Sequence, residues 1–184
     1  MGRLICFIGA PASGKSTLAS AVHTELKMKG VNSIFVGEIA TNYIAEYGLP
    51  NTPLDQMVVF YKQLNAERMF VKNKDIVICD SSSILNYFYF RSLYKAKLTD
   101  KDIAAINHIQ KEILKSLSQW DHIFYVPPIP IQESSDGIRY HGKEEIEKID
   151  RWIKSYLEME NIRHDDLSQI SLEERVAHIV KLLS

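Results

Sequence analysis

The chain has 184 residues with a formal net charge of −1, and 46% of its residues are apolar and 24% charged. Length and composition predict one globular domain with a full hydrophobic core, and they exclude a disordered or fibrous protein. The balanced charge predicts no general attraction to nucleic acid or acidic lipid, and no apolar run approaches the ~20 residues of a membrane span. Because the first apolar run begins almost at residue 1, we expect no signal peptide and a cytoplasmic location.

A strand, a loop and a helix are predicted at the start of the chain. Residues 4–8 form an apolar run typical of a buried strand, and after residues 9–17 apolar positions recur at helical spacing as far as Leu26. Cys6 lies inside this first run, and Cys79 lies inside a later one. Two thiols in apolar runs are typical of packing residues rather than of a disulfide framework.

The loop at residues 9–17 reads Gly-Ala-Pro-Ala-Ser-Gly-Lys-Ser-Thr and matches G-x-x-x-x-G-K-[ST], the P-loop or Walker A motif. Its glycines allow successive backbone N–H groups to form a concave anion nest at a helix N-terminus. We therefore expect a bound nucleoside triphosphate, with Lys15 bridging the outer phosphates and the Ser16 hydroxyl ligating Mg²⁺. The expected nucleotide-binding residues are Gly9, Ala12, Ser13, Gly14, Lys15, Ser16 and Thr17. The alternative is a glycine-rich turn that only reverses the chain.

Helices and strands alternate along the rest of the chain. Further strands are predicted at residues 33–36, 76–79 and 123–126, and a weaker one near Ile162 that the polar run 164–166 interrupts. Helices are predicted at residues 38–47, 52–72, 84–94, 99–117, 146–156 and 171–183. This order predicts an α/β protein with a three-layer P-loop NTPase fold, in which helices cover both faces of a mostly parallel five-stranded sheet. We expect a single domain over residues 1–184.

Asp80 directly follows a predicted buried strand, at the edge where a parallel sheet presents residues to a ligand. There it can hold Mg²⁺ through water or accept a proton from an attacking hydroxyl, although an aspartate before two serines also suits a helix N-cap. Motor ATPases usually place a water-activating glutamate at the next position, which here is Ser81. Residues 73–75 do not complete the Asn-Lys-x-Asp guanine reader of GTPase switches. The pattern therefore disfavours both of these classes.

A small-molecule kinase also needs an acceptor pocket, a cation near the transferred phosphoryl group and a lid that excludes water. The proline-rich segment 127–143 is the candidate lid, and Arg139 within it could neutralise charge in the transition state. The alternative is a solvated surface loop with an incidental arginine. The aromatic residues around Tyr87 could stack a substrate base, but their helical spacing favours packing against the sheet.

From the P-loop to Gly142, the chain resembles the ATPase and kinase family that includes the ribosylnicotinamide kinase domain and its thymidylate-kinase-like relatives. The matching pieces, in order, are the P-loop, residues 38–48 (similar to the family's Glu-x-x-Arg-x-Tyr segment), Gln63, Glu67, Asp80, and the Asp-Gly-Ile-Arg stretch 136–139 followed by Gly142. Only the P-loop is specific by itself, and the shared order of the others carries the resemblance.

This resemblance implies that ATP, with Mg²⁺, phosphorylates a hydroxyl of a nucleoside-like acceptor. The implied catalytic residues are Lys15, Asp80 and Arg139, the metal ligands are Ser16 and Asp80, and the acceptor-binding residues are Glu38, Asn42, Tyr87 and Asp136. Two departures affect the acceptor. Asn42 occupies the place where relatives often have arginine, so an anionic or phosphate-bearing acceptor loses a partner. Ser82 stands where ribosylnicotinamide kinases often have a second aspartate. The kinase class is therefore better supported than any one acceptor.

Two other functions remain open at this point. One is a kinase that acts on a nucleic-acid end or a modified base, which would need a basic channel that the net charge does not indicate. The other is a nucleotide-dependent binding protein with negligible turnover.

The six histidines show no ligand spacing with one another or with cysteine, so we expect no transition-metal site. We expect no membrane partner, and the sequence does not predict an oligomeric state.

Overall fold

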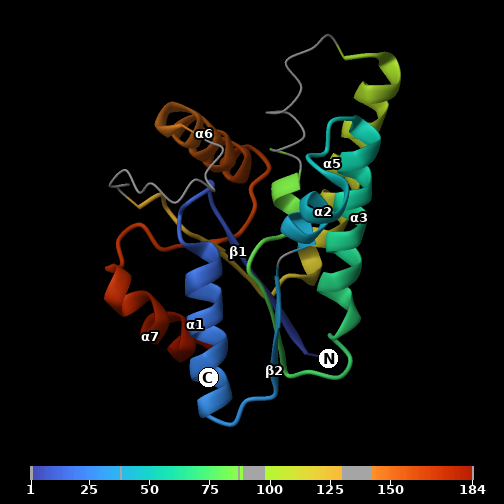
Figure 1. The fold of residues 1–184 in the computed structure, drawn as a ribbon. Helices are drawn as coiled ribbons and strands as arrows, with labels where there is room; N and C mark the ends of the chain where they lie inside the picture. Colours follow the sequence, from blue (N-terminus) through green and yellow to red (C-terminus); the bar gives the residue numbers. More distant parts are fainter. Residues whose placement is uncertain (1, 38, 87, 89–97, 130–141, 184) are drawn as a thin grey trace.

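The structure is a computed structural model that describes residues 2–37, 39–86, 88, 98–129 and 142–183 (Figure 1). Of the residues assigned a role from the sequence, Glu38, Tyr87, Asp136 and Arg139 lie outside this described part, as does most of the segment 127–143.

A five-stranded parallel sheet forms the centre of the molecule, with strand order β2-β3-β1-β4-β5. Its strands are β1 (Arg3–Ile8), β2 (Ser33–Val36), β3 (Ile76–Cys79), β4 (His122–Tyr125) and β5 (Asp165–Asp166). The β1 and β3 strands are almost entirely buried, as expected for parallel strands that helices cover on both faces. The predicted parallel sheet is confirmed.

Helices cover both faces of this sheet (Figure 1). They are α1 (Lys15–Met28), α2 (Ile39–Tyr47), α3 (Pro53–Met69), α5 (Asp100–Ser116), α6 (Lys143–Met159) and α7 (Leu172–Leu183), with a 3₁₀ turn at Leu117–Gln119 and helical backbone at residues 83–86. None of the described helices is both long and apolar enough to span a membrane.

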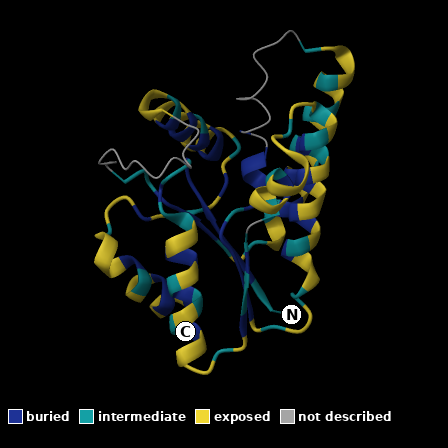
Figure 2. Ribbon diagram, in the orientation of Figure 1, coloured by how far each residue is buried: buried dark blue, intermediate teal, exposed yellow. Residues whose placement is uncertain are grey.

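Two hydrophobic clusters, one on each face, hold the layers together (Figure 2). On one face, α1 and α7 pack against the sheet, and Phe7 stacks on Phe124 at a ring-centroid distance of 5.3 Å. On the other face, α3, α5 and α6 pack through residues such as Phe60, Ile113 and Ile153. Cys6 and Cys79 are buried and free, as the sequence predicts. The molecule therefore has the three layers that the sequence predicts.

Capping residues set the starts of α3 and α5, two of the helices on the second face. The Thr52 side chain accepts a hydrogen bond from the Asp55 backbone N–H, and the Asp55 carboxylate accepts one from the Thr52 N–H at 2.9 Å. Thr99 and Asp102 repeat the same capping box at the start of α5. Both boxes satisfy backbone donors that a helix start leaves without partners.

The fifth strand differs from the sequence prediction. It consists of Asp165–Asp166, inside the polar run expected to interrupt it, rather than of residues near Ile162. β5 lies at the edge of the sheet, where one side of a strand faces solvent, so its residues need no apolar pattern. The Asp165 carboxylate also contacts His122 Nδ1 on β4 at 2.9 Å. Burial pattern alone could not locate such a strand.

The connections that leave β1 and β3 diverge at the carboxyl edge of the sheet. β1 leads into α1 on one face, whereas the chain after β3 leads to α5 on the opposite face. Because β1 and β3 are direct neighbours in the sheet, this divergence occurs between adjacent strands. In open α/β sheets, ligands bind in the crevice that such a switch in topology creates.

Candidate functional site

The P-loop connects β1 to α1 through a strained, tightly curled backbone. Ala12 and Gly14 both have positive φ angles, 60° and 82°, and an alanine adopts this left-handed conformation only at some cost. The Gly14 carbonyl accepts the Leu18 N–H at 2.9 Å and so begins the hydrogen bonding of α1. No acidic residue lies in the first turn of α1, so no carboxylate there offsets the positive end of the helix dipole. Such a loop suits an anion with several oxygen atoms.

Gly9 is required because the chain after β4 passes directly beside the loop. A Cβ atom at Gly9 would lie 2.3 Å from the Val126 carbonyl oxygen, far inside van der Waals contact. Gly9 itself does not have a positive φ, so this close approach, rather than backbone conformation, excludes a side chain. The first glycine of the motif therefore allows β4 to support the loop.

Lys15 directs its ammonium group back into the loop. Its Nζ donates hydrogen bonds to the Ala10 carbonyl at 2.7 Å and to Ser13 Oγ at 3.4 Å. The side chain keeps some surface exposure, but the surrounding protein removes most water from the ammonium. This desolvation lowers the pKa of Lys15 to about 8, and the negative charge of Asp80 partly opposes the shift. Lys15 is therefore a desolvated cation facing a carboxylate.

Asp80 lies at the carboxyl end of β3, beside the P-loop strand. Its backbone N–H donates to the Val36 carbonyl at 3.1 Å, and its side chain is buried. A Cβ atom at Gly37 would lie 3.2 Å from Asp80 Cγ, so a glycine there leaves room for the carboxylate. Cys79, the last residue of β3, pairs with Cys6 of β1, which continues to Ile8, so both strands end near one another at the same edge of the sheet. The structure thus brings together Lys15 and Asp80, which lie far apart in the sequence.

Ser16 and Asp80 are suitable ligands for a magnesium ion. Ser16 is exposed at the start of α1, and Asp80 lies near the Lys15 ammonium of the same loop. Hydroxyl and carboxylate oxygens are the hard donors that Mg²⁺ prefers, and it often takes only one or two of them from protein. Within the described part of the chain, no group of three or more His, Cys, Asp or Glu side chains is placed to hold a metal ion.

Of the residues expected to bind the acceptor, Asn42 alone lies among the described residues. It is exposed on α2. The remaining acceptor residues, Glu38, Tyr87 and Asp136, lie outside the described residues, and so does Arg139. Phe88, next to Tyr87, is buried in the core of the second face, in agreement with the packing interpretation of the aromatic run.

Glu67 is a feature of this edge to which the sequence analysis assigned no role. It is only 1% exposed, and its carboxylate accepts hydrogen bonds from the Ser83 backbone N–H at 2.6 Å and from Ser83 Oγ at 2.9 Å. Burial raises the pKa of Glu67 to about 7, and these hydrogen bonds oppose the shift. One signal was present in the sequence: Glu67 follows the inward-facing Phe60 by seven residues, on the same face of α3.

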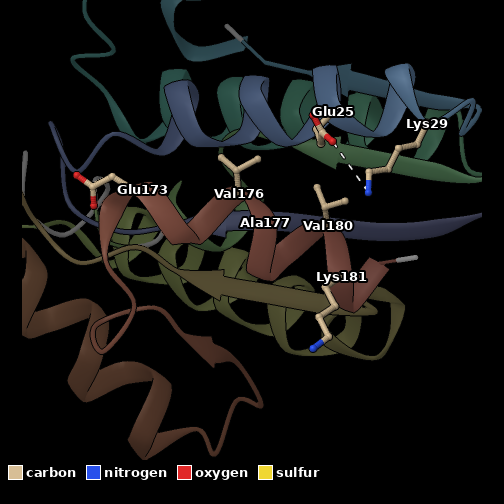
Figure 3. Close-up of a pocket in the computed structure, with 7 residues that line it drawn as sticks. All are labelled: Glu25, Lys29, Glu173, Val176, Ala177, Val180 and Lys181. Atoms are coloured by element: carbon tan, nitrogen blue, oxygen red, sulfur yellow. Dashed lines mark ion pairs between the residues drawn. The ribbon is translucent and has the colours of Figure 1, made fainter.

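Two hollows in the described part of the molecule lie away from this edge. One of about 480 Å³ lies between α1 and α7, and Figure 3 shows the Glu25–Lys29 ion pair on its rim. Another of about 450 Å³ lies near Arg3 and residues 72–75, at the amino edge of the sheet. Neither is lined by a P-loop residue or by Asp80. The candidate site is identified by the strained P-loop backbone, the desolvated Lys15 and the buried Asp80, not by the size of a hollow.

Comparisons with known proteins agree with this geometry. A family model described as an AAA domain matches residues 4–175. The fold is similar to NadR protein in complex with NR (TM-score 0.73, 19% identity, 98% of this chain and 50% of that chain) and to NadR protein with NAD and AMP-PNP (TM-score 0.70, 17%, 98% and 48%). It is also similar to deoxyadenosine kinase from M. mycoides with the products dCMP and dCDP (TM-score 0.59, 13%, 97% of each chain).

At these identities, the solved structures establish the fold. Together with the family model, they confirm the P-loop α/β architecture and the family resemblance that the sequence indicates. The chain spans about half the length of the NadR chains that it matches. No curated protein matches it at the level of sequence.

The first prediction concerns the close approach at Gly9. Gly9→Ala should lower the free energy of unfolding by about 2–3 kcal/mol, because the new Cβ overlaps a backbone carbonyl that has no side-chain freedom to move away. Denaturant unfolding followed by circular dichroism measures this change. Gly142→Ala is the matched control, since its Cβ would enter open space at an ordinary φ of −71°. Because Gly142 is the N-cap of α6, where alanine is less favourable, this change should lower stability by about 1 kcal/mol or less.

The second prediction concerns the buried carboxyl of Glu67. Its pKa is about 7 in the folded protein against 4.5 for the ordinary group, so the folded state holds a proton that the unfolded chain releases between these values. The stabilisation of the folded state by this bound proton is complete below pH ~4.5, and it is lost as the pH rises through about 7. Between pH 4.5 and 8.5, wild type should lose roughly 3 kcal/mol relative to Glu67→Gln. The exposed Glu158→Gln variant should follow wild type, and parallel curves for Glu67→Gln would contradict the prediction.

Proposed function

The chain belongs to the family of AAA domains, and on that premise we propose that it is a kinase that uses ATP and Mg²⁺ to phosphorylate a hydroxyl group of a nucleoside-like small molecule. We place this activity in a single domain over residues 1–184. The observation that carries the proposal is the position of the desolvated Lys15 ammonium, which donates back into the P-loop and lies within the electrostatic influence of Asp80 at the end of the neighbouring strand β3.

Backbone amides and one cation bind the nucleotide in this proposal. The N–H groups of residues 12–17 surround the phosphates, where the positive end of the α1 dipole adds attraction. The Lys15 ammonium exchanges the Ala10 carbonyl for phosphate oxygens, whose negative charge compensates the ammonium for its lost water. Gly9, Gly14 and Thr17 complete the nucleotide-binding set.

Asp80 supplies the acidic group of the reaction. Its carboxylate accepts the proton of the attacking hydroxyl or, with the Ser16 hydroxyl, holds the metal ion. Bound Mg²⁺ neutralises charge on the phosphate oxygens. Since the bonds to phosphorus change through a loose transition state, positioning and charge neutralisation provide most of the rate.

The acceptor and lid residues complete the proposal. Glu38, Asn42, Tyr87 and Asp136 bind the acceptor, and Arg139 in the lid segment approaches the transferred group. The structural neighbours include a protein in complex with NR and a deoxyadenosine kinase with bound nucleotide products, which supports a nucleoside-like acceptor. A hydroxyl acceptor also agrees with Ser81, because no glutamate follows Asp80 to activate water for hydrolysis.

The third prediction is a pH dependence of nucleotide binding. Because the pKa of Lys15 is about 8, ATP affinity should fall as the pH rises past that value, by roughly tenfold at pH 9. Titration calorimetry from pH 7 to 9.5 measures this fall. Lys15→Met should bind weakly without the alkaline fall, whereas Lys27→Met, exposed on the same helix, should behave as wild type. A constant wild-type affinity over this range would contradict the assignment of Lys15.

The fourth prediction tests the reaction itself. A screen of nucleosides, nucleotides and oligonucleotides should find acceptors that release ADP above the background without acceptor, and nucleosides should be the best of them. Asp80→Asn should then lower kcat by about 10²–10⁴-fold. Asp75→Asn, an exposed aspartate before the opposite end of β3, is the matched control and should leave kcat unchanged.

Two results would contradict the proposed function. Full phosphoryl transfer by Asp80→Asn would remove Asp80 from the reaction. ADP release that no acceptor stimulates would indicate a nucleotide-dependent binding protein, and stimulation only by oligonucleotides, with loss of binding at higher salt, would indicate a kinase of nucleic-acid ends.

A further inference from the structure

Two polar side chains on the inward face of α3 contact the turn that follows Asp80. Gln63 and Glu67 lie one helical turn apart, and both are buried against the second face of the sheet. Gln63 Nε2 donates to the Ser81 carbonyl at 3.4 Å, and Glu67 accepts the N–H and the hydroxyl of Ser83. Buried amides and carboxylates on a packed helix face need specific partners, and here all of these partners lie within three residues of Asp80.

These contacts fix the turn at both of its ends. Ser81 directly follows Asp80, and Ser83 is the first residue with helical backbone after β3. On the strand side, the Asp80 N–H is already bound to the Val36 carbonyl. With Ser81 and Ser83 also held, the backbone on both sides of Asp80 has fixed hydrogen-bond partners. The direction of the Asp80 side chain is then set by its backbone and by the space that Gly37 leaves.

Holding this turn with the Glu67 carboxylate costs free energy, because a charged group must be buried. Glu67 is desolvated strongly enough to raise its pKa to about 7. Burial raises the pKa of the Cys6 and Cys79 thiols, and the charge of Glu67 raises it further. A glutamine could accept the same N–H without this penalty, but its amide nitrogen could not accept the hydrogen bond from the Ser83 hydroxyl. A charged acceptor, however, makes the shorter and stronger bond, 2.6 Å here, and two bonds to one residue define an orientation.

We propose that Gln63 and Glu67 act as a clamp on residues 81–83 and that Glu67, through this clamp, is a positioning residue for the Asp80 carboxylate in phosphoryl transfer. The inference rests on the proposed function for the role of Asp80, but the clamp is a separate claim about contacts. A reacting group displaced by about 1 Å can lose 10²-fold in rate without any loss of substrate binding. Loss of the clamp should therefore lower kcat and leave KM for ATP nearly unchanged.

The experiment compares Glu67→Gln, Ser83→Ala and the double variant. Glu67→Gln should lower kcat by about 10–100-fold with less than a threefold change in KM for ATP. Ser83→Ala, which keeps the backbone bond, should lower kcat by about three- to tenfold. Because both substitutions remove the same contact between Glu67 and Ser83, kcat of the double variant should be only slightly lower than that of Glu67→Gln alone. Losses that multiply would overturn the proposed route through Ser83.

Matched controls separate positioning from general destabilisation. The Asp121 carboxylate accepts the Leu4 N–H at 2.7 Å at the amino edge of the sheet, and the buried Ser116 hydroxyl donates to the Ile113 carbonyl at 2.8 Å. Asp121→Asn and Ser116→Ala therefore remove similar contacts away from Asp80. Both should leave kcat unchanged even where they lower stability. A kcat loss in Asp121→Asn equal to that in Glu67→Gln would overturn the inference.

A readout without turnover keeps the clamp testable by itself. Hydrogen exchange followed by mass spectrometry should show faster exchange at residues 80–86 in Glu67→Gln than in wild type, and unchanged exchange there in Asp121→Asn. Unchanged exchange in Glu67→Gln would overturn the clamp whatever the activity. Conversely, a wild-type protein that phosphorylates no acceptor would overturn the proposed function, and the role of Glu67 in transfer with it, while the exchange result would still decide whether the clamp exists.

Discussion

The Lys15 ammonium, removed from water and faced by the Asp80 carboxylate, is the interaction on which the arrangement of this site depends. A desolvated cation is stable only where oxygen atoms and a negative charge surround it, and the curled loop supplies the Ala10 carbonyl and Ser13 Oγ. To bring these atoms together, the backbone adopts positive φ at Ala12. β1 and β3 must also end side by side, which the parallel register provides.

The two sides of this pair are supported in different ways. On the β1 side, support comes from backbone packing, because the Val126 carbonyl lies so close to Gly9 that no side chain fits between them. On the β3 side, support comes from hydrogen bonds, since Val36 holds the Asp80 N–H and Glu67 holds Ser83. In the proposed function the loop binds through its backbone and the carboxylate acts in one direction. Backbone packing suits the first requirement, and fixed hydrogen bonds suit the second.

Local signals in the sequence predicted the elements, whereas contacts between distant residues were not predictable. The P-loop, the parallel strands and the capping boxes each depend on neighbours a few residues apart, so spacing predicted them. β5 was misplaced because an edge strand of two residues, Asp165–Asp166, has no apolar pattern to recognise. The role of Glu67 was missed because its partner lies 16 residues away and is reached only after α3 packs on the sheet. The lowered pKa of Lys15 likewise depends on burial, which no motif specifies.

The distribution of energetic costs over the molecule favours a reactive site over a turn that merely reverses the chain. A non-glycine residue at positive φ, a lysine with a lowered pKa and a buried carboxyl with a raised pKa lie near the carboxyl edge of β1 and β3. Elsewhere local preferences are largely met, as in the satisfied capping boxes of α3 and α5, and the other non-glycine residue at positive φ in the described part of the chain, Asn161, is of a type that tolerates this conformation. A reversing turn could be built from relaxed backbone without any desolvated charge. Because each of these costs lowers stability, their concentration at one edge is expected only where the same groups act on a ligand.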